Sequence, residues 1–198
     1  MKELTFKQYR QIDLTFLCIL TAIFEAVATL ASNTWFSLQA MTISITLTLT
    51  CIAIIRWGAL GIITTLTGSV VYCLLSSATT KHYIIYCVGS LFCLVVIPLL
   101  NLLKKERVKK DFVYRLMFVG ATYFSIAIGR WLCSLPFTFS FGTILAFIFS
   151  DILSLLFAIV VLSIAKNADG LLEDQKSYLL RLENERIEKE ESNNFTSF

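Results

Sequence analysis

The sequence has little charge, little proline and almost no histidine. Only 16% of its 198 residues are charged, two are proline and one is histidine, whereas 57% are hydrophobic. An ordinary soluble domain is about 25% charged and about 45–50% apolar. The shortage of charge therefore excludes a soluble globular domain and predicts a protein that is embedded in a membrane.

Motifs that carry chemistry are also missing. There is no P-loop, so any work driven by ATP would need a separate ATPase. No HExxH, GxSxG or aspartate-rich prenyl motif is present, and the single histidine, His82, has no ligand-forming neighbours in sequence. The six cysteines are scattered without a CxxC pair, which favours packing over metal or disulfide chemistry. We therefore expect no enzyme, no metal and no cofactor.

Long hydrophobic runs dominate what is present. A helix needs roughly 20 apolar residues to cross a bilayer. Six runs reach about this length, at 14–33, 38–56, 58–77, 83–103, 112–134 and 143–165. They predict an all-α membrane protein with a single six-span domain over residues 1–165. A charged helix is expected over 166–191 and a disordered tail over 192–198.

The second run contains the stretch "TISITLTLT", which alternates apolar and hydroxylated residues. Alternation with period two is typical of a strand. An isolated strand cannot satisfy its backbone groups in lipid, however, while a helix can. We therefore predict a helix over the whole run.

The basic residues predict the orientation. If the N-terminus lies inside, 15 of the 17 Lys and Arg residues fall on the inner side, and only Lys81 and Arg130 do not. This bias follows the positive-inside rule. Both termini and the loop "KKERVKKD" (104–111) are therefore expected in the cytoplasm, with the chain in the plasma membrane of a bacterial cell. Because the positive charge reports topology, we expect no nucleic-acid partner.

The first run carries a glutamate, Glu25, near its middle. A charged side chain at the centre of a bilayer costs about 2.5–3.5 kcal/mol on insertion scales, so it needs a partner or a function. Small and polar residues share its helical face: Cys18, Thr21, Glu25, Ala28, Thr29 and Ser32. Bulky residues form the opposite face: Phe16, Leu20, Ile23, Val27 and Leu30. Glu25 is therefore predicted to point into the helix bundle.

Two further ionisable residues, Arg130 and Asp151, are predicted at a similar depth, in the outer half of the membrane. Two hypotheses remain open. The three groups form a structural ion pair with one spare, protonated acid, or they line a polar cavity that opens outward and binds a ligand. Aromatic and amide residues near the same level belong to an interfacial belt or to the ligand site. The candidate substrate-binding residues are Glu25, Arg130, Asp151, Trp35, Gln39 and Tyr86.

The first run also contains an AxxxA pair, Ala22 and Ala26. Small residues let helices approach closely, so the pair serves internal packing or docks another membrane subunit. Together with the six short spans, the pair resembles the substrate-binding S-components of energy-coupling-factor (ECF) vitamin transporters. Four stretches resemble an uncharacterised bacterial group of such proteins: "FEAVATLASNTWF", "RWGALGIITTLTGSVVYCL", "IYCVGSLF" and "DGLLEDQKSYLLRL".

The resemblance implies a six-helix monomer that captures a vitamin-like micronutrient outside the cell. It further implies delivery by toppling of the monomer within a complex with a transmembrane coupling subunit and two ATPase subunits. Ala22 and Ala26 would match the family's contact with the coupling subunit. Two other functions remain open from the sequence. One is a non-transporting membrane scaffold that resembles the cell-shape protein family, and the other is a proton-coupled carrier that works alone.

Overall fold

The computed structural model describes residues 5–35, 42–137, 140, 142–168 and 170–195, and every regular element in these ranges is helical. The all-α prediction is therefore confirmed. Short π and 3-10 turns connect some helices, at Gly58–Gly61, Ile84–Val88 and Leu91–Val95. The α-helices are α1 (Phe6–Trp35), α2 (Thr46–Trp57), α3 (Ile62–Leu75), α4 (Thr80–Tyr83), α5 (Val96–Leu103), α6 (Lys105–Lys110), α7 (Phe112–Ser134), α8 (Gly142–Ser150), α9 (Ile152–Ala165) and α10 (Gln175–Phe195).

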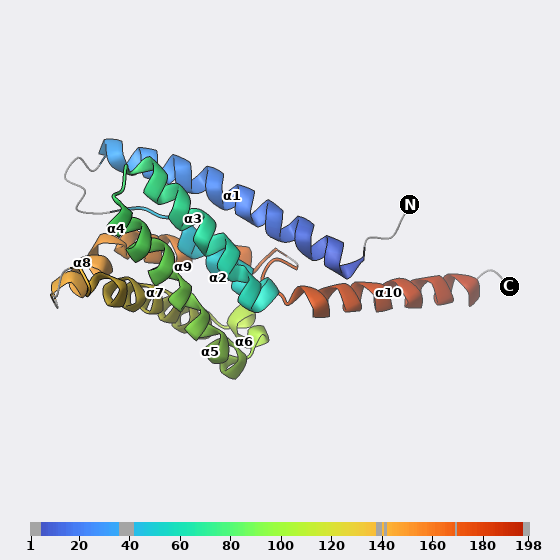
Figure 1. Cartoon of the computed structure of the whole chain (residues 1–198). Helices are drawn as coiled ribbons and strands as arrows, with labels where there is room; N and C mark the ends of the chain where they lie inside the picture. The colour runs from blue at the N-terminus through green and yellow to red at the C-terminus, as the bar shows by residue number, and fades with distance from the viewer. Residues whose placement is uncertain (1–4, 36–41, 138–139, 141, 169, 196–198) are drawn as a thin grey trace.

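The helices pack side by side into one elongated bundle (Figure 1). Both ends of the chain and α6 lie at one end of this bundle, which we name the basic end. The α3–α4 and α7–α8 connections lie at the opposite end, and α10 projects from the basic end (Figure 1). The termini and the "KKERVKKD" loop thus share one side of the bundle; that this side is cytoplasmic stays a prediction.

Four helical stretches are long and apolar enough to cross a membrane, and a bent pair adds a fifth if it counts as one span. They are Phe6–Thr34, Thr46–Leu75, Thr80–Leu103 and Phe112–Ser134, with Gly142–Ser150 and Ile152–Ala165 as the bent pair. These apolar helices indicate a membrane-embedded protein. That the chain crosses the membrane six times stays a prediction.

The stretch Thr46–Leu75 folds back on itself, so its two helices, α2 and α3, lie side by side rather than end to end. Its turn is at Gly58, whose φ of +60° belongs to a region that glycine adopts readily. The hydroxyls of Thr50 on α2 and Thr65 on α3 lie 2.9 Å apart, so the two helices are antiparallel neighbours. With 12 residues, α2 is about 18 Å long and shorter than a bilayer core of roughly 30 Å.

This hairpin depends on a close approach at Gly61. A Cβ atom at Gly61 would lie 2.6 Å from the backbone nitrogen of Ile54. Gly61→Ala is therefore expected to lower the free energy of unfolding by about 1–3 kcal/mol, as overpacking does. The measurement is denaturant unfolding in mixed micelles. Gly120→Ala in α7 is the matched control, since nothing lies within 4 Å of its added Cβ; equal losses in both variants would contradict the close approach.

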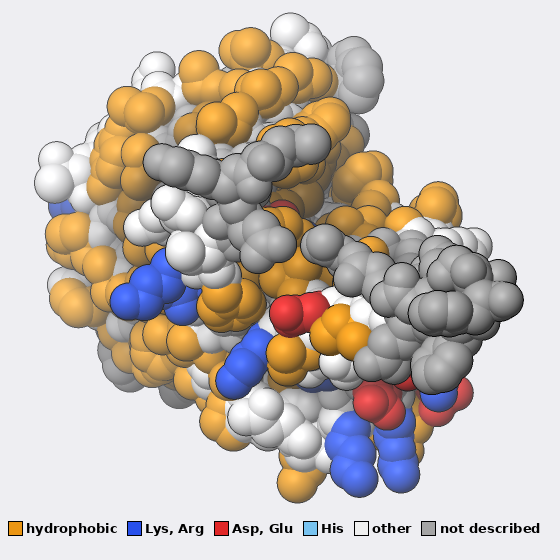
Figure 2. Space-filling model, turned by 90° about the vertical axis from the view of Figure 1, so that its right-hand side faces the viewer, with side chains coloured by type: hydrophobic (Ala, Val, Ile, Leu, Met, Phe, Trp, Pro, Cys, Tyr) orange, Lys and Arg blue, Asp and Glu red, His pale blue; other side chains and the backbone are white. Residues whose placement is uncertain are grey.

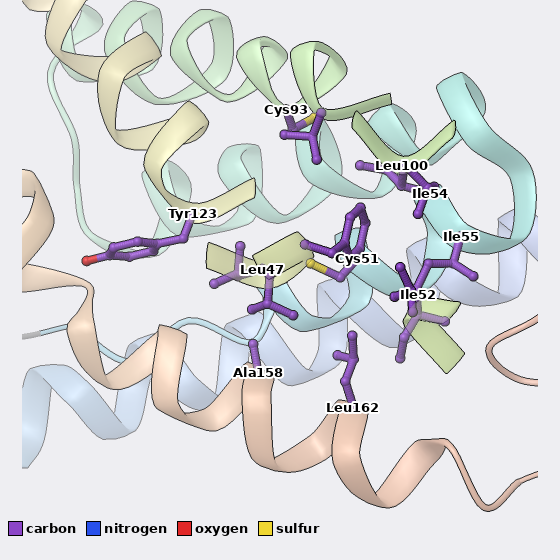
Figure 3. Close-up of a cluster of buried hydrophobic side chains, with 14 of the residues drawn as sticks. Leu47, Cys51, Ile52, Ile54, Ile55, Cys93, Leu100, Tyr123, Ala158 and Leu162 are labelled. Carbon is purple, nitrogen blue, oxygen red and sulfur yellow. The ribbon is translucent and has the colours of Figure 1, made fainter. Parts of the chain in front are cut away.

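The apolar core fills the space between α2, α5, α7 and α9 (Figure 3). Cys51, Leu100 and Leu162, from three of these helices, are fully buried. The outer surface of α1 is apolar instead, as predicted: Phe16, Ile23, Val27 and Leu30 are exposed, and Leu20 is half-buried. The predicted polar stripe is buried from Thr21 to Ser32, and Cys18 at its start is half-buried. The helical periodicity of this first run is thus confirmed.

A polar cluster joins three segments at the basic end. Arg56, at the end of α2, donates to both carboxylate oxygens of Asp13 on α1, at 2.7 and 3.0 Å. Arg56 also donates to the carbonyl of Gly170 at 3.0 Å. The Gly170 carbonyl accepts a second hydrogen bond from the buried amide of Gln175, at 2.7 Å. These contacts fix the residues before α10 against the bundle.

The helix predicted over 166–191 differs from α10 for this reason. Residues 166–168 and 170–174 form turns, bends and irregular backbone rather than a helix, and Leu172 among them is buried. The helix therefore begins only at Gln175. It continues to Phe195, so residues 192–195 are helical rather than disordered, while 196–198 lie outside the described residues.

Candidate ligand-binding chamber

The bundle is interrupted where α2 begins. Residues 42–45 are not helical, so the prediction of a helix over 38–56 is wrong for them, and 38–41 lie outside the described residues. Other segments satisfy this backbone: the Thr42 N–H donates to the Ser150 carbonyl at 2.8 Å, and the Ser44 N–H donates to the Ser154 hydroxyl at 2.8 Å. Irregular backbone at membrane depth is tolerated where it is buried in protein or lines a cavity.

A second interruption lies directly beside the first. The axis of the α8–α9 pair bends by 42° at a break, and Asp151 is the residue between the two helices. The Asp151 carboxylate accepts a hydrogen bond from the hydroxyl of Thr42. The irregular backbone before α2 and the broken α8–α9 pair therefore meet at one point. Discontinuous helices of this kind form the substrate sites of many membrane transporters.

Glu25 closes the first interruption. Its side chain comes from α1 and is 1% exposed. One carboxylate oxygen, Oε2, accepts hydrogen bonds from the N–H groups of Ile45 and Thr46, at 3.0 and 3.1 Å. The same oxygen accepts from the hydroxyls of Ser44 and Thr46, both at 2.9 Å. Glu25 thus caps the N-terminus of α2 from another helix, where a negative charge also favours the helix dipole.

Arg130 and Asp151 form the ion pair at this level. Their side chains are 13% and 16% exposed, and the Arg130 guanidinium lies 4.5 Å from the ring centre of Tyr86. Among the described residues, the Arg130 Nε has no hydrogen-bond partner, and no cation pairs with Glu25. The expected ion pair is therefore present, and the second acid, Glu25, accepts four hydrogen bonds instead of pairing with the arginine.

A cavity of about 280 Å³ lies above these groups, at the end of the bundle opposite the basic end. Its lining includes the rings of Tyr72 and Tyr86, which are tilted by 39° and whose centres are 4.9 Å apart. Within the described part of the chain, no Asp, Glu, Lys or Arg lines it. Hydroxyl groups dominate its wall: Thr29, Ser32, Thr42, Ser76, Ser77, Thr79 and Ser150. We name this cavity the hydroxyl chamber.

Thr29 contributes an unpartnered hydroxyl next to the hydroxyl chamber. The residue is 2% exposed and lines the cavity. Its hydroxyl oxygen is itself buried and has no hydrogen-bond partner among the described residues. A buried hydroxyl without a partner costs about 1–3 kcal/mol. A ligand that reached this oxygen from the chamber would remove that cost.

The predicted site residues occupy two levels. Tyr86 lines the hydroxyl chamber, while Glu25, Arg130 and Asp151 surround a smaller pocket that shares Thr42, Tyr72 and Tyr86 with it. The Trp35 side chain and Gln39 lie outside the described residues. The sequence analysis did not predict Thr42, Ser44 and Thr46 as residues near the site. The only sign of them in the sequence is the strand-like alternation of apolar and hydroxylated residues.

The predicted docking pair lies on the boundary of the bundle. Ala22 and Ala26 are half-buried on α1, and the exposed side chains of Ile23 and Val27 adjoin them. This position allows contact with a partner in the membrane. Docking itself stays a prediction.

Comparison of the chain with protein-family models, with characterised proteins and with solved structures finds no match. The function is therefore inferred from the hydroxyl chamber, from the broken α8–α9 pair and from the irregular backbone before α2.

Proposed function

We propose that the protein captures a small polar solute in the hydroxyl chamber for uptake across the plasma membrane. The observation that carries this proposal is the chamber itself, about 280 Å³ in volume and lined by hydroxyl and aromatic groups. Ligand sites are commonly concave, with a few convergent polar groups, and in transporters they lie beside broken helices. By the positive-inside rule, the chamber would open to the outside.

The proposed role is that of the substrate-binding subunit of an ECF-type transporter, the family that the sequence resembles. The chain carries no P-loop. A transmembrane coupling subunit and two ATPase subunits would therefore supply the energy. A vitamin-like micronutrient with hydroxyl, amide or ring-nitrogen groups would fit the hydrogen-bonding wall and the Tyr72–Tyr86 pair.

The direct test is mass spectrometry of small molecules that the purified protein retains. Thr29→Val is expected to lower the retained solute about tenfold, because one hydrogen bond of about 0.5–1.5 kcal/mol is lost and a methyl group faces a polar ligand. The same variant should be as stable as the wild type, or more so by about 1–3 kcal/mol, because an unpartnered buried hydroxyl is removed.

Thr48→Val is the matched control for this experiment. Thr48 is 1% exposed and its hydroxyl also lacks a partner among the described residues, but it does not line the chamber. The control should gain stability without losing solute. Equal solute in the wild type and in Thr29→Val would contradict the chamber as the binding site, and an empty wild type would contradict capture.

A separate prediction concerns the coupling subunit. Ala26→Leu adds bulk at the half-buried edge of α1. It should abolish co-purification with the coupling and ATPase subunits, while the retained solute and the unfolding midpoint stay unchanged. Ile23→Leu, at an exposed neighbouring position, is the control. Loss of folding in Ala26→Leu would instead show internal packing, and co-purification of the wild type with cell-wall machinery would favour the scaffold function.

A further inference from the structure

A second cavity, of about 880 Å³, lies at the basic end, between α6 and the first turns of α10. Five cationic side chains and three anionic ones line it, so the cavity carries an excess of positive charge. The cations are Lys104, Lys105, Lys109, Lys110 and Arg181. Figure 2 looks onto this end, where basic and acidic side chains appear among hydrophobic ones.

Internal ion pairs neutralise only part of this charge. Lys105 pairs with Asp174, and Glu173 pairs with both Lys109 and Arg181. Partial burial alone would raise the pKa of the Asp174 carboxyl, but the hydrogen bond and the charge of Lys105 outweigh it and hold that pKa below its usual value. The Lys105–Asp174 and Lys109–Glu173 pairs join α6 to the chain before α10.

Lys104 and Lys110 remain outside these pairs. Both line the cavity and are exposed, and no carboxylate of the described residues pairs with either. Lys104 also has a φ of +59°, an uncommon conformation for a residue other than glycine. Its carbonyl accepts the Arg107 N–H at 3.0 Å, so the strained residue begins α6. Strain of this kind clusters at ligand sites and other functional positions.

Apolar side chains flank α6 on both sides in the sequence. Leu102 precedes it and is 80% exposed, while Phe112 and Val113 follow it and are 54% and 62% exposed. In a membrane protein such residues face acyl chains. The same short region therefore offers a cationic cavity for an anion and an apolar surface for hydrocarbon. An anionic phospholipid combines both chemistries.

We propose that the cavity at the basic end binds the phosphate headgroup of an anionic phospholipid, with Lys104 and Lys110 as the charges that select it. Basic pockets at the cytoplasmic ends of transmembrane helices bind lipid headgroups in this way. The bound lipid would hold α6 and the start of α10 together at the membrane surface. This site is independent of the solute that the hydroxyl chamber takes.

Native mass spectrometry of the full chain in detergent tests this proposal. The probes are phosphatidylglycerol, phosphatidylcholine and inorganic phosphate. The wild type should retain phosphatidylglycerol over phosphatidylcholine. The double variant K104Q/K110Q should lose this preference about tenfold or more, because each basic residue near the surface contributes about 1 kcal/mol to binding of anionic lipid.

K7Q/R10Q is the matched control, since it removes two positive charges at the basic end from residues that do not line the cavity. It should keep the preference. Equal losses in the two double variants would overturn the proposal, because general surface charge would then explain the preference. A wild type without preference, or inorganic phosphate that binds as tightly as the lipid, would also overturn it.

Discussion

Glu25→Ala should lower the free energy of unfolding by about 1–3 kcal/mol or more, because the backbone N–H of Ile45 loses its acceptor and that of Thr46 keeps only a 3.3 Å bond to the Ser44 hydroxyl. Glu25 accepts from these two N–H groups at 3.0 and 3.1 Å. The first turn of α2 is enclosed by other helices, so water cannot replace the carboxylate freely. Denaturant unfolding in mixed micelles measures the loss.

Glu25→Gln is the control, because its amide oxygen can still accept from the same donors. It loses the charge but keeps the cap. The loss should then be about 1–2 kcal/mol, the difference between charged and neutral hydrogen bonds. If Glu25 contacted a solute instead of capping α2, both variants would keep their stability and lose retained solute. Wild-type stability in Glu25→Ala would contradict the cap.

Local periodicity was sufficient to predict much of the fold. The α7 helix spans 112–134, as the hydrophobic run predicted, because a charged loop precedes the run and Pro136 follows it. The first run is equally clear. Its small and polar residues recur at helical spacing, so the burial of Thr21, Glu25 and Ser32 followed from the sequence.

The break before α2 could not be predicted in the same way. A general argument, that lipid leaves no partner for a strand-like backbone, led us to predict a helix over 42–45. The partners exist, but they come from distant parts of the chain: Glu25 on α1 and Ser150 at the end of α8. No pattern within the nine residues 42–50 can indicate that a hydrogen-bond acceptor for their backbone lies on another helix.

The pairing of the three intramembrane charges posed a similar problem. Depth predicted that Glu25, Arg130 and Asp151 lie at one level, and they do line one small pocket. Depth does not specify how each helix is rotated about its axis. The break at Asp151 turns its carboxylate toward Arg130, while Glu25 faces the start of α2. Which acid pairs with the arginine therefore depends on tertiary geometry.

The start of α10, at the basic end, could not be predicted from local sequence either. Charge and helix propensity predicted a helix from 166, yet Gly170 has a φ of +71° and the chain turns there. The turn is held by Arg56, which donates to the Gly170 carbonyl. Propensity describes a segment alone, and here a contact from another helix determines where the segment becomes helical.

Breaking the Arg130–Asp151 pair should have a comparably large effect on stability. Arg130→Met leaves Asp151 without its cation, and Asp151→Leu leaves Arg130 without its anion. Each side chain is mostly buried, at 13% and 16% exposed. Removing one partner of a buried pair costs about 3–5 kcal/mol, because an uncompensated charge remains. Thermal and denaturant unfolding of both variants in detergent measure these losses.

The double variant Arg130→Met/Asp151→Leu separates a structural role from contact with the solute. It should be more stable than either single variant, because apolar replacement of a whole buried pair is often neutral or favourable. It should also retain the solute, since the described lining of the hydroxyl chamber contains neither residue. A stable double variant that loses the solute would show that the ion pair contacts the ligand directly. Thr29→Val is expected to behave in the opposite way, with an intact fold and less retained solute. Comparing the two variants therefore separates an effect on stability from an effect on solute binding.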